Sequence, residues 1–552
     1  MSDFLVTDVL VVGEGCAGQT AALSASEMGR DVILLGDGRA PATAISTGFL
    51  TFAAHEGFNR DQVFEAMSQT TGKGLCDIGL LRRLVDEAPK EMAELIADYN
   101  IPVDKVERGL RARRAVSKSG SELLSGLEIG YSKDDGVEDI TGLMMEFSST
   151  HGTSLYAQLR KAVKASPKIR RLRGSALVLE PGSTTVGAIV DGKPVTIAAR
   201  SIILATGGIQ GLYEVTDNPE TLTGDGHGMA LDAGVEFIDM EFIQFYPLSV
   251  REEGNPTLFL YPDFPRLATL INDKGENVLV KHLGADAQYL SELHNWDQLS
   301  VVVQTEIVNG NTVFVDFRET KAQDWALDSL TGTFLSKCVP NFLTTPVRVA
   351  PSAHYTIGGL RVDLDGRTSF PNVYAVGELA GGAHGANRHG GAALVEAITF
   401  GRIAGRHAAE SLNAKVAKQG ESLLPTTIKS GKSGRIDGVL GDLRRANQFA
   451  LGPIRDGARL HRVGEQFAEL LDEVRSFGWN GYSEMQEVLR IERAIKLCDG
   501  MRRAMLRRTE TRGVHNRSDF PSASEAWLKK QVVSLRNGKF HFEDAPVYRG
   551  IG

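Results

Sequence analysis

The sequence predicts an α/β protein built from several domains, and three observations support this. The chain has 552 residues, which is too long for one hydrophobic core, so about two to four domains are expected. An apolar run from Asp8 leads directly into the pattern Gly13-x-Gly15-x-x-Gly18. Residues 412–435 are rich in Lys, Gly and Ser, which is typical of a linker, and apolar residues at helical spacing follow them.

The N-terminal segment has the pattern strand, tight turn, helix, strand. A helix is expected over residues 19–28 and a second strand over residues 31–35. Gly13 allows the tight turn, Gly15 lets the backbone approach a pyrophosphate, and Gly18 lets the helix pack closely on the strand. The pyrophosphate would bind the free N–H groups at the start of the helix. The pattern therefore predicts a dinucleotide site, with an ordinary Gly-rich turn as the alternative.

One position departs from this pattern. The acidic residue expected at the end of the second strand, where it would bind a ribose hydroxyl, falls on Gly36. Asp37 stands one place later and is assigned to that role.

Composition and charge exclude several classes of protein. Apolar residues make up 42% and charged residues 24%, which is ordinary for a soluble globular protein. The net charge of −8 argues against nucleic acid and against an anionic membrane surface as partners. No apolar run is long enough to span a membrane, and no signal peptide is recognised, so a cytoplasmic protein is expected. The four cysteines are far apart, so neither disulfides nor a metal or iron–sulfur site is expected.

The segments that follow are assigned in chain order. Residues 40–54 are small and polar and would wrap a cofactor, residues 61–99 and 152–166 are helical, and residues 178–199 are antiparallel strands turning at Asp191-Gly192. A buried strand from Ser201 then ends in Ala-Thr-Gly-Gly208, which can bring backbone close to a bound cofactor.

Longer motifs identify a family. They are Thr223-Gly-Asp-Gly-His-Gly-Met-Ala-Leu231, Asp239-Met-Glu-Phe-Ile-Gln-Phe245, Ala353-His-Tyr-Thr-Ile-Gly-Gly359, Asn372-Val-Tyr-Ala-Val-Gly-Glu378, His384-Gly-Ala-Asn-Arg-His-Gly-Gly391 and Arg508-Thr-Glu-Thr-Arg-Gly-Val-His-Asn-Arg517. In this order they resemble the flavoprotein family of succinate dehydrogenase, fumarate reductase and L-aspartate oxidase, with adenylylsulfate reductase a more distant member. The resemblance extends from Asp8 to about Pro521.

The resemblance implies an architecture. A Rossmann-like FAD-binding domain would be discontinuous, over residues 1–233 and 347–412. An α+β capping domain over residues 234–346 would be inserted into it, and a linker over 413–435 would lead to a C-terminal helical domain and tail over 436–552.

The resemblance also implies FAD as cofactor. The residues that would bind it are Gly13, Gly15, Cys16, Ala17, Gly18, Asp37, Thr47, Gly48, Ala205, Thr206, Gly207, Asp225, Glu378, Arg388, Gly391, Ala393 and Leu394. Glu378 would bind a ribityl hydroxyl, and the backbone at Gly391–Leu394 would lie beside the isoalloxazine, where a helix N-terminus stabilises reduced flavin. Residues 40–48 contain no His, so the flavin is expected to be non-covalent. Family members with covalent flavin usually have a raised potential, so its absence favours reduction of a double bond.

The substrate site resembles the family's only in part. His354 and Arg388 match residues that bind a substrate carboxylate, for which a guanidinium provides a planar fork of donors. Tyr246 replaces a substrate-binding His of the family, and Leu260 and Tyr261 replace a charged anchor. A less acidic substrate, aromatic or bulkier than fumarate, is therefore expected.

Arg266 is assigned as the proton donor, because it stands just before Thr269-Leu-Ile-Asn-Asp-Lys-Gly275, where the family has its catalytic arginine. An alignment backward from that segment without gaps places Phe264 there instead, and Arg251 and Arg348 are weaker alternatives.

The resemblance implies an FAD-dependent oxidoreductase that moves hydride between flavin N5 and an activated C–C bond of a small carboxylate. The alternatives are an electron-transferring subunit that depends on an iron–sulfur partner, and an oxidase like L-aspartate oxidase. Electrons would come from a separate donor subunit, through which the protein could associate with a membrane.

Overall fold

A computed structural model describes residues 3–46, 49–50, 59–101, 103–116, 122–130, 139–147, 152–253, 260, 268–285, 287, 296–320, 335–410, 422–425, 427–432 and 434–547. Within these ranges no helix combines the length and the apolar character needed to cross a membrane.

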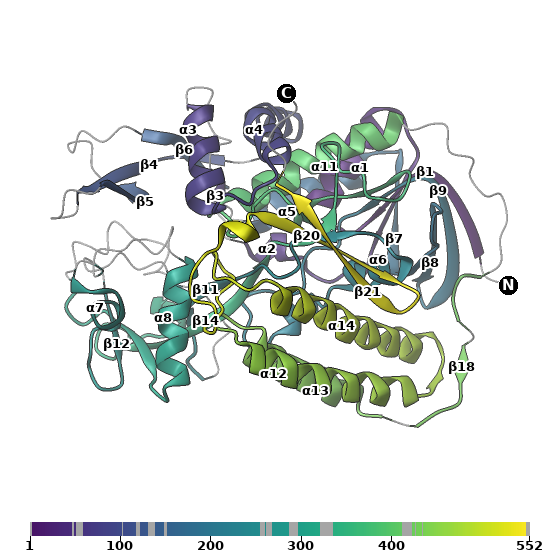
Figure 1. The fold of residues 1–552 in the computed structure, drawn as a ribbon. Helices are drawn as coiled ribbons and strands as arrows, with labels where there is room; N and C mark the ends of the chain where they lie inside the picture. Colours follow the sequence, from purple (N-terminus) through teal and green to yellow (C-terminus); the bar gives the residue numbers. More distant parts are fainter. Residues whose placement is uncertain are drawn as a thin grey trace.

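A sheet of parallel strands lies on the side of the molecule where the N-terminus is (Figure 1). Their spatial order is β7 (Ile169–Leu179), β2 (Val32–Gly36), β1 (Asp3–Val12), β9 (Lys193–Leu204) and β16 (Val373–Ala375). This is the order of a dinucleotide-binding sheet, which confirms the predicted α/β class.

Both faces of this sheet are covered. Leu10 and Val12 face a core shared with α12 (Ile436–Ala450), α13 (Gly457–Ser476) and α14 (Tyr482–Arg507). Val9 and Val11 face a core shared with α1 (Cys16–Glu27), α4 (Ile78–Tyr99) and α11 (Ala392–Glu410). A strand that is buried on both faces has apolar residues along its whole length, which explains the apolar run that follows Asp8. Figure 1 shows these two groups of helices on opposite sides of the sheet.

A meander extends the sheet. Strand β8 (Thr185–Val190) pairs antiparallel with β7 and β9. Asp191 and Gly192 both have positive φ, 48° and 77°, as a tight hairpin turn requires. The predicted turn is confirmed.

Helices α1 (Cys16–Glu27) and α11 (Ala392–Glu410) pack closely on each other. A Cβ on Gly401 would lie 2.7 Å from the carbonyl oxygen of Ala17, and one on Gly405 would lie 2.4 Å from that of Ala21. These two glycines therefore let α11 lie directly against α1.

The region predicted as one helix over residues 61–99 is broken. It contains α3 (Arg60–Glu65), a π-helical turn over Ala66–Thr71, and α4 (Ile78–Tyr99). Lys73 and Gly74 have positive φ, which ends the first helix, and the Asp77 side chain accepts a hydrogen bond from Leu80 N to cap α4. Helix α5 (Gly152–Ala165) agrees with the prediction.

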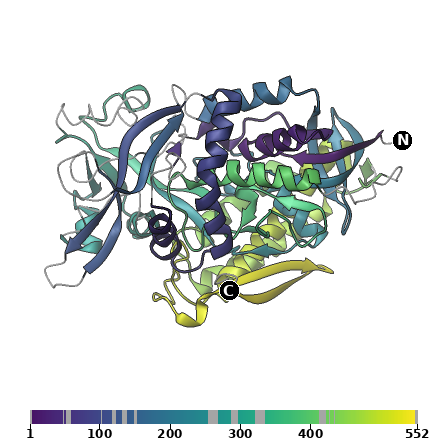
Figure 2. The ribbon, with the colours of Figure 1, turned by 90° about the horizontal axis from the view of Figure 1, so that it is seen from above.

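A separate antiparallel sheet contains β3 (Phe49–Leu50), β6 (Asp139–Phe147), β4 (Val103–Val116) and β5 (Glu122–Gly130). It projects away from the sheet of parallel strands (Figure 2). No sequence pattern predicted it.

The described part of the capping region contains a four-stranded sheet and two helices. The strand order is β11 (Ile243–Val250), β14 (Val347–Thr356), β13 (Val313–Asp316) and β12 (Thr269–Asn272), and the helices are α7 (Val278–Leu283) and α8 (Trp296–Val308). The capping domain was predicted to end at residue 346. The sheet continues beyond this residue, because β14 pairs with β11 and β13.

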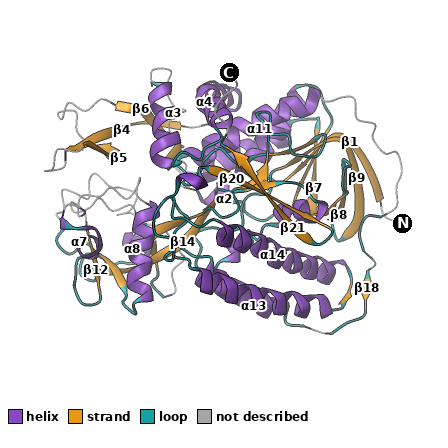
Figure 3. Ribbon diagram, in the orientation of Figure 1, coloured by secondary structure: helices purple, strands orange, loops and turns teal. Residues whose placement is uncertain are grey.

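The C-terminal region begins with helices α12 (Ile436–Ala450), α13 (Gly457–Ser476) and α14 (Tyr482–Arg507). It does not end as a helical unit. Strands β20 (Lys529–Arg536) and β21 (Lys539–Pro546) form a hairpin (Figure 3). This hairpin joins β10 (Phe237–Ile238), β15 (Gly359–Arg361) and β17 (Ala380–Gly381) in one sheet. The remaining short elements are α2 (Ala42–Ile45), α6 (Asp225–Ala233), β18 (Ile428–Lys429), β19 (Trp479–Asn480) and 3-10 turns at Gln210–Leu212, Gly377–Leu379 and Glu525–Trp527.

Candidate active site

The glycine-rich turn after β1 is shaped by close backbone contacts. A Cβ on Gly13, whose φ is 117°, would lie 2.1 Å from the carbonyl oxygen of Ala205, and one on Gly18 would lie 2.0 Å from that of Gly13. Gly15 is different, because the nearest atom to a Cβ there is Thr43 Oγ1 at 3.5 Å. Gly13 and Gly18 are therefore required by packing, whereas Gly15 opens onto the space between α1 and α2.

The start of α1 lies in this turn. The backbone N–H of Cys16 donates to Thr43 Oγ1 at 3.1 Å. Cys16 and Ala17 are buried, and burial raises the pKa of the Cys16 thiol to about 11. The thiol is therefore neutral near pH 7 and acts in packing. Thr47 and Gly48 lie outside the described residues.

The end of β2 explains why Gly stands where an acid was expected. A Cβ on Gly36 would lie 2.2 Å from Cγ of Glu14, so Gly36 makes room for that side chain. Glu14 in turn accepts from Arg171 Nη2 at 2.7 Å. No sequence pattern predicted this ion pair across the sheet.

Asp37 and Asp225 are brought together by one arginine. The backbone N–H of Arg39 donates to Asp37 Oδ1 at 2.9 Å, and its guanidinium pairs with the same carboxylate. Arg39 Nη2 also lies 3.6 Å from Asp225 at the start of α6. Both acids remain predicted cofactor ligands.

The strand end Ala205-Thr206-Gly207 lies beside α6. Gly207 has a φ of 76°, and a Cβ on Gly226 would meet Thr206 Oγ1 at 2.1 Å. Thr206 Oγ1 is buried and has no hydrogen-bond partner within the described part of the chain. A buried hydroxyl without a partner is rare, so a bound group is expected to supply one.

Glu378 stands in the 3-10 turn after β16. It accepts from Thr356 N at 2.8 Å and pairs with the side-chain amide of Gln210. Burial is the main cause that raises its pKa to about 7. A carboxyl so placed can accept or donate a hydrogen bond at neutral pH, which suits a hydroxyl-bearing ligand.

Four side chains from separate elements meet around His354. His354 comes from β14, Tyr246 from β11, Trp296 from the first turn of α8, and Arg388 from the segment before α11. The ring centroids of Trp296 and His354 are 5.1 Å apart, and those of Tyr246 and Trp296 are 5.0 Å apart. The Arg388 guanidinium carbon lies 5.4 Å from the Trp296 ring. The predicted residues His354, Arg388 and Tyr246 are therefore brought together.

His354 is held by an aspartate that the sequence did not indicate. Asp217 Oδ2 lies 2.9 Å from His354 Nδ1 and accepts from Ser352 Oγ at 3.0 Å. Asn218 Nδ2 donates both to Asp217 Oδ1 and to the His354 carbonyl, each at 2.9 Å. These contacts fix the imidazole by its Nδ1 edge and leave Nε2 on the opposite edge of the ring.

Arg388 is buried among polar and aromatic groups. Its Nε donates to Gln244 Oε1 at 3.0 Å and its Nη1 to the His389 carbonyl at 3.2 Å, while Tyr355 lies 4.6 Å away, ring to guanidinium carbon. Burial and the charge of Arg388 lower the pKa of His389 to about 4, so His389 is neutral near pH 7. Arg388 therefore supplies a permanent positive charge.

The described residues that were predicted as proton donors do not all lie near His354. Tyr246 is buried, and its hydroxyl donates to the carbonyl of Leu260. Arg251 and Arg348 are exposed at the end of the β11–β14 ladder away from His354. Arg266, with Phe264 and Tyr261, lies outside the described residues.

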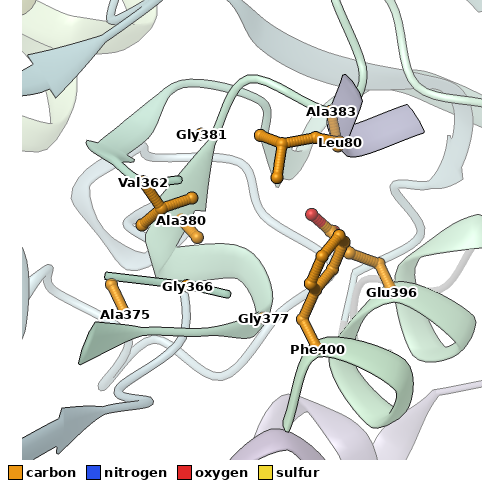
Figure 4. A pocket seen from close by; sticks show the side chains of 10 residues that line it. All are labelled: Leu80, Val362, Gly366, Ala375, Gly377, Ala380, Gly381, Ala383, Glu396 and Phe400. Carbon is orange, nitrogen blue, oxygen red and sulfur yellow. The ribbon is translucent and has the colours of Figure 1, made fainter. Parts of the chain in front are cut away.

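A small pocket is lined by Leu80 of α4, by Glu396 and Phe400 of α11, and by residues of the segment 362–383 (Figure 4). Glu396 is the ionisable residue among those that line it. Its Oε2 accepts from the Tyr355 hydroxyl at 2.8 Å and lies 2.8 Å from His384 Nε2. Through these contacts Glu396 connects the start of α11 to β14 and to His384, in the segment that contains Arg388.

Fold and site together define a flavin-dependent oxidoreductase, and comparison with known families agrees. The model described as FAD binding domain matches residues 8–394, and the model described as fumarate reductase flavoprotein C-term matches residues 441–549. The chain belongs to the flavoprotein family of fumarate reductase and succinate dehydrogenase, and its cofactor is FAD.

Individual relatives extend over almost the whole chain. The fumarate reductase (CoM/CoB) of Methanothermobacter marburgensis has a subunit that is 30% identical over 575 residues, 97% of this chain and 98% of that protein. L-aspartate oxidase of Streptomyces coelicolor is 28% identical over 597 residues, 99% and 94% of the two chains. A variant of the E. coli quinol fumarate reductase FrdA has a TM-score of 0.83 at 21% identity, covering 99% and 98% of the two chains.

Proposed function

We propose that this protein moves hydride between N5 of FAD and an activated C–C bond of a small carboxylate substrate. The observation that carries the proposal is the convergence of His354 and Arg388 beside the start of α11. Arg388 precedes Ala392, the first residue of that helix, by four positions. A carboxylate bound there would lie next to the backbone predicted to hold the isoalloxazine.

In this proposal Arg388 binds the carboxylate. Its guanidinium is held in place by Gln244 and by the aromatic rings on its faces, so little side-chain entropy is lost when the substrate binds. His354, oriented by Asp217, would present Nε2 to the same substrate.

The source of the proton is the second part of the proposal. Arg266 is the candidate from sequence. His354 is the candidate from geometry, because its imidazole is held by the Asp217 carboxylate at Nδ1 and lies against Tyr246 and Trp296 in the site. Both can be tested by substitution.

We further propose that a separate iron–sulfur protein supplies the electrons. Within the described residues no group of three or more His, Cys, Asp or Glu side chains could hold a metal ion. The relative from M. marburgensis is itself named as one subunit of its enzyme. Co-purification of the native protein with an iron–sulfur protein would support this assembly.

An oxidase is the second candidate function, because several relatives of similar length are L-aspartate oxidases. The two functions differ in the fate of the electrons. An oxidase would release peroxide in air when given its reducing substrate, whereas the proposed reductase would pass electrons to an unsaturated carboxylate.

Anaerobic flavin spectroscopy tests the proposed function. The holoprotein, reduced with dithionite, is mixed with a set of unsaturated carboxylates, and return of the yellow oxidised flavin is followed. We expect at least one 2-enoate to reoxidise the flavin, and Arg388→Ala to abolish this. If no such acid reoxidises the flavin, or if Arg388→Ala with full FAD content reacts at the wild-type rate, the proposal is wrong.

A further inference from the structure

The capping side of the site is closed by an indole. Trp296 is 3% exposed, and its ring contacts both predicted carboxylate ligands, with His354 at 5.1 Å between centroids and the Arg388 guanidinium carbon at 5.4 Å. Its Cζ2 atom would lie 3.9 Å from a Cβ built on Gly390. Trp296 therefore lies between the capping domain and the segment that leads into α11.

The indole N–H is buried without a partner. Within the described part of the chain, Trp296 Nε1 makes no hydrogen bond. A buried Trp usually satisfies this donor, and leaving it unpaired costs about 1–3 kcal/mol. The donor belongs to a ring that touches both predicted ligands, so a molecule bound in the site is the natural source of an acceptor.

The charges around the site are unequally distributed. The positive charge comes from Arg388 on the FAD-domain side, and His389 beside it is neutral. The described capping residues that face His354 are Tyr246 and Trp296, which are both neutral. The ionisable neighbour of Trp296 in sequence is the acid Asp297, whose carboxylate lies 4.0 Å from Lys73. Tyr246 and Trp296 offer no cation, so a second carboxylate placed against these two described rings would lose its hydration without forming an ion pair with either of them.

We infer that Trp296 determines the substrate class: an α,β-unsaturated monocarboxylate with a neutral oxygen acceptor, such as an amide or ester carbonyl, at its other end. This rests on the proposed function. Arg388 and His354 would bind the carboxylate. The rings of Tyr246 and Trp296 would contact the planar double bond, and the indole N–H of Trp296 would donate to the neutral oxygen. In the reaction, hydride from reduced FAD adds to one alkene carbon and a proton to the other, so the alkene is reduced and FAD is oxidised.

Fumarate and its monoamide, fumaramate, are a matched pair of probes. They have nearly the same shape, but fumaramate has one negative charge and a neutral carbonyl where fumarate has a second carboxylate. Binding to the oxidised holoprotein is measured by calorimetry, and flavin reoxidation is measured separately with the dithionite-reduced protein. We expect fumaramate to bind at least about tenfold more tightly than fumarate.

Trp296→Phe keeps an aromatic ring and removes the N–H. We expect it to retain FAD and to lose about tenfold in affinity for fumaramate, with little change for fumarate. Trp527→Phe is the matched control, because the indole N–H of Trp527 donates to Thr509 Oγ1 elsewhere in the chain, and it should bind both probes as the wild type does.

The outcomes separate this inference from the proposed function. Equal or tighter binding of fumarate, no detectable binding of fumaramate, or unchanged fumaramate binding in Trp296→Phe would overturn the role of Trp296. Binding of fumaramate with the expected dependence on Trp296, but with no 2-enoate reoxidising the flavin, would overturn the proposed hydride transfer and leave the assignment of Trp296 intact.

Discussion

Asp217 and His354 form a partly buried carboxylate–imidazole pair, with Asp217 Oδ2 2.9 Å from His354 Nδ1. The two residues are far apart in sequence and meet because the segment after the first 3-10 turn crosses β14, where Thr216 bridges to Ala353. A carboxylate at Nδ1 selects the tautomer with its proton on that nitrogen, and this orients the imidazole.

Replacing this carboxylate with an amide tests the pair. Asp217→Asn keeps the shape but removes the charge and the preference for one tautomer. We expect the turnover number to fall about 100-fold, with carboxylate affinity nearly unchanged and a larger solvent isotope effect, because proton transfer becomes limiting. Asp232→Asn, the same change in a surface ion pair with Arg493, is the control. A loss of affinity with unchanged turnover would mean that Asp217 acts only in binding.

The glycine-rich turn offers a second test. Gly15 has a φ of −68°, which any residue adopts, and a Cβ there has ordinary contact distances. Gly15→Val should therefore fold but exclude the pyrophosphate and bind no FAD. Gly18→Val should not fold, because its Cβ would clash with the Gly13 carbonyl. Flavin absorbance and circular dichroism check both expectations, and full flavin content in Gly15→Val would refute the assigned loop.

The mode of flavin attachment is a third prediction. Because residues 40–48 contain no His, we expect acid precipitation to release all of the flavin into the supernatant. Flavin that stays with the precipitated protein would show a covalent bond through another residue.

The sequence predicted the FAD-binding core well because that information is local. The strand, the turn and the helix at residues 8–28 are encoded by neighbouring residues, and Gly13 and Gly18 are needed for contacts within the same unit. Trp296 and Asp217 could not be predicted, because their roles depend on how α8 and the segment around Thr216 pack against the capping sheet at β14. The β20–β21 hairpin was missed for the same reason, since its partner β10 is almost 300 residues earlier in the chain.

Glu378 gives a fourth prediction, on stability of the apoprotein. Its folded-state pKa of about 7 is above the ordinary value of 4.5, so the folded state holds a proton that the unfolded state has lost between these values. This group therefore lowers stability as pH rises from about 4.5 to 7, by on the order of 3 kcal/mol in total. Glu378→Gln should be more stable than the wild type at pH 8 and close to it at about pH 4, below the ordinary pKa of 4.5, as measured by urea unfolding. A difference that does not change with pH would exclude this titration.

Arg266 gives the last prediction, and the described residues on either side of it support its relevance. Leu260 and Ala268 are both buried in the capping core, and the Leu260 carbonyl accepts from Tyr246, whose ring lies 5.7 Å from His354. An arginine can donate a proton only where it is desolvated, because its ordinary pKa is above 12. If Arg266 is the donor, Arg266→Ala should lower turnover by about 10²–10⁴-fold with FAD content and carboxylate affinity kept, while Arg251→Ala, which removes an exposed charge nearby in sequence, should change neither. A fall of less than about tenfold would assign the proton to His354 or Tyr246 and make Arg266 a surface charge.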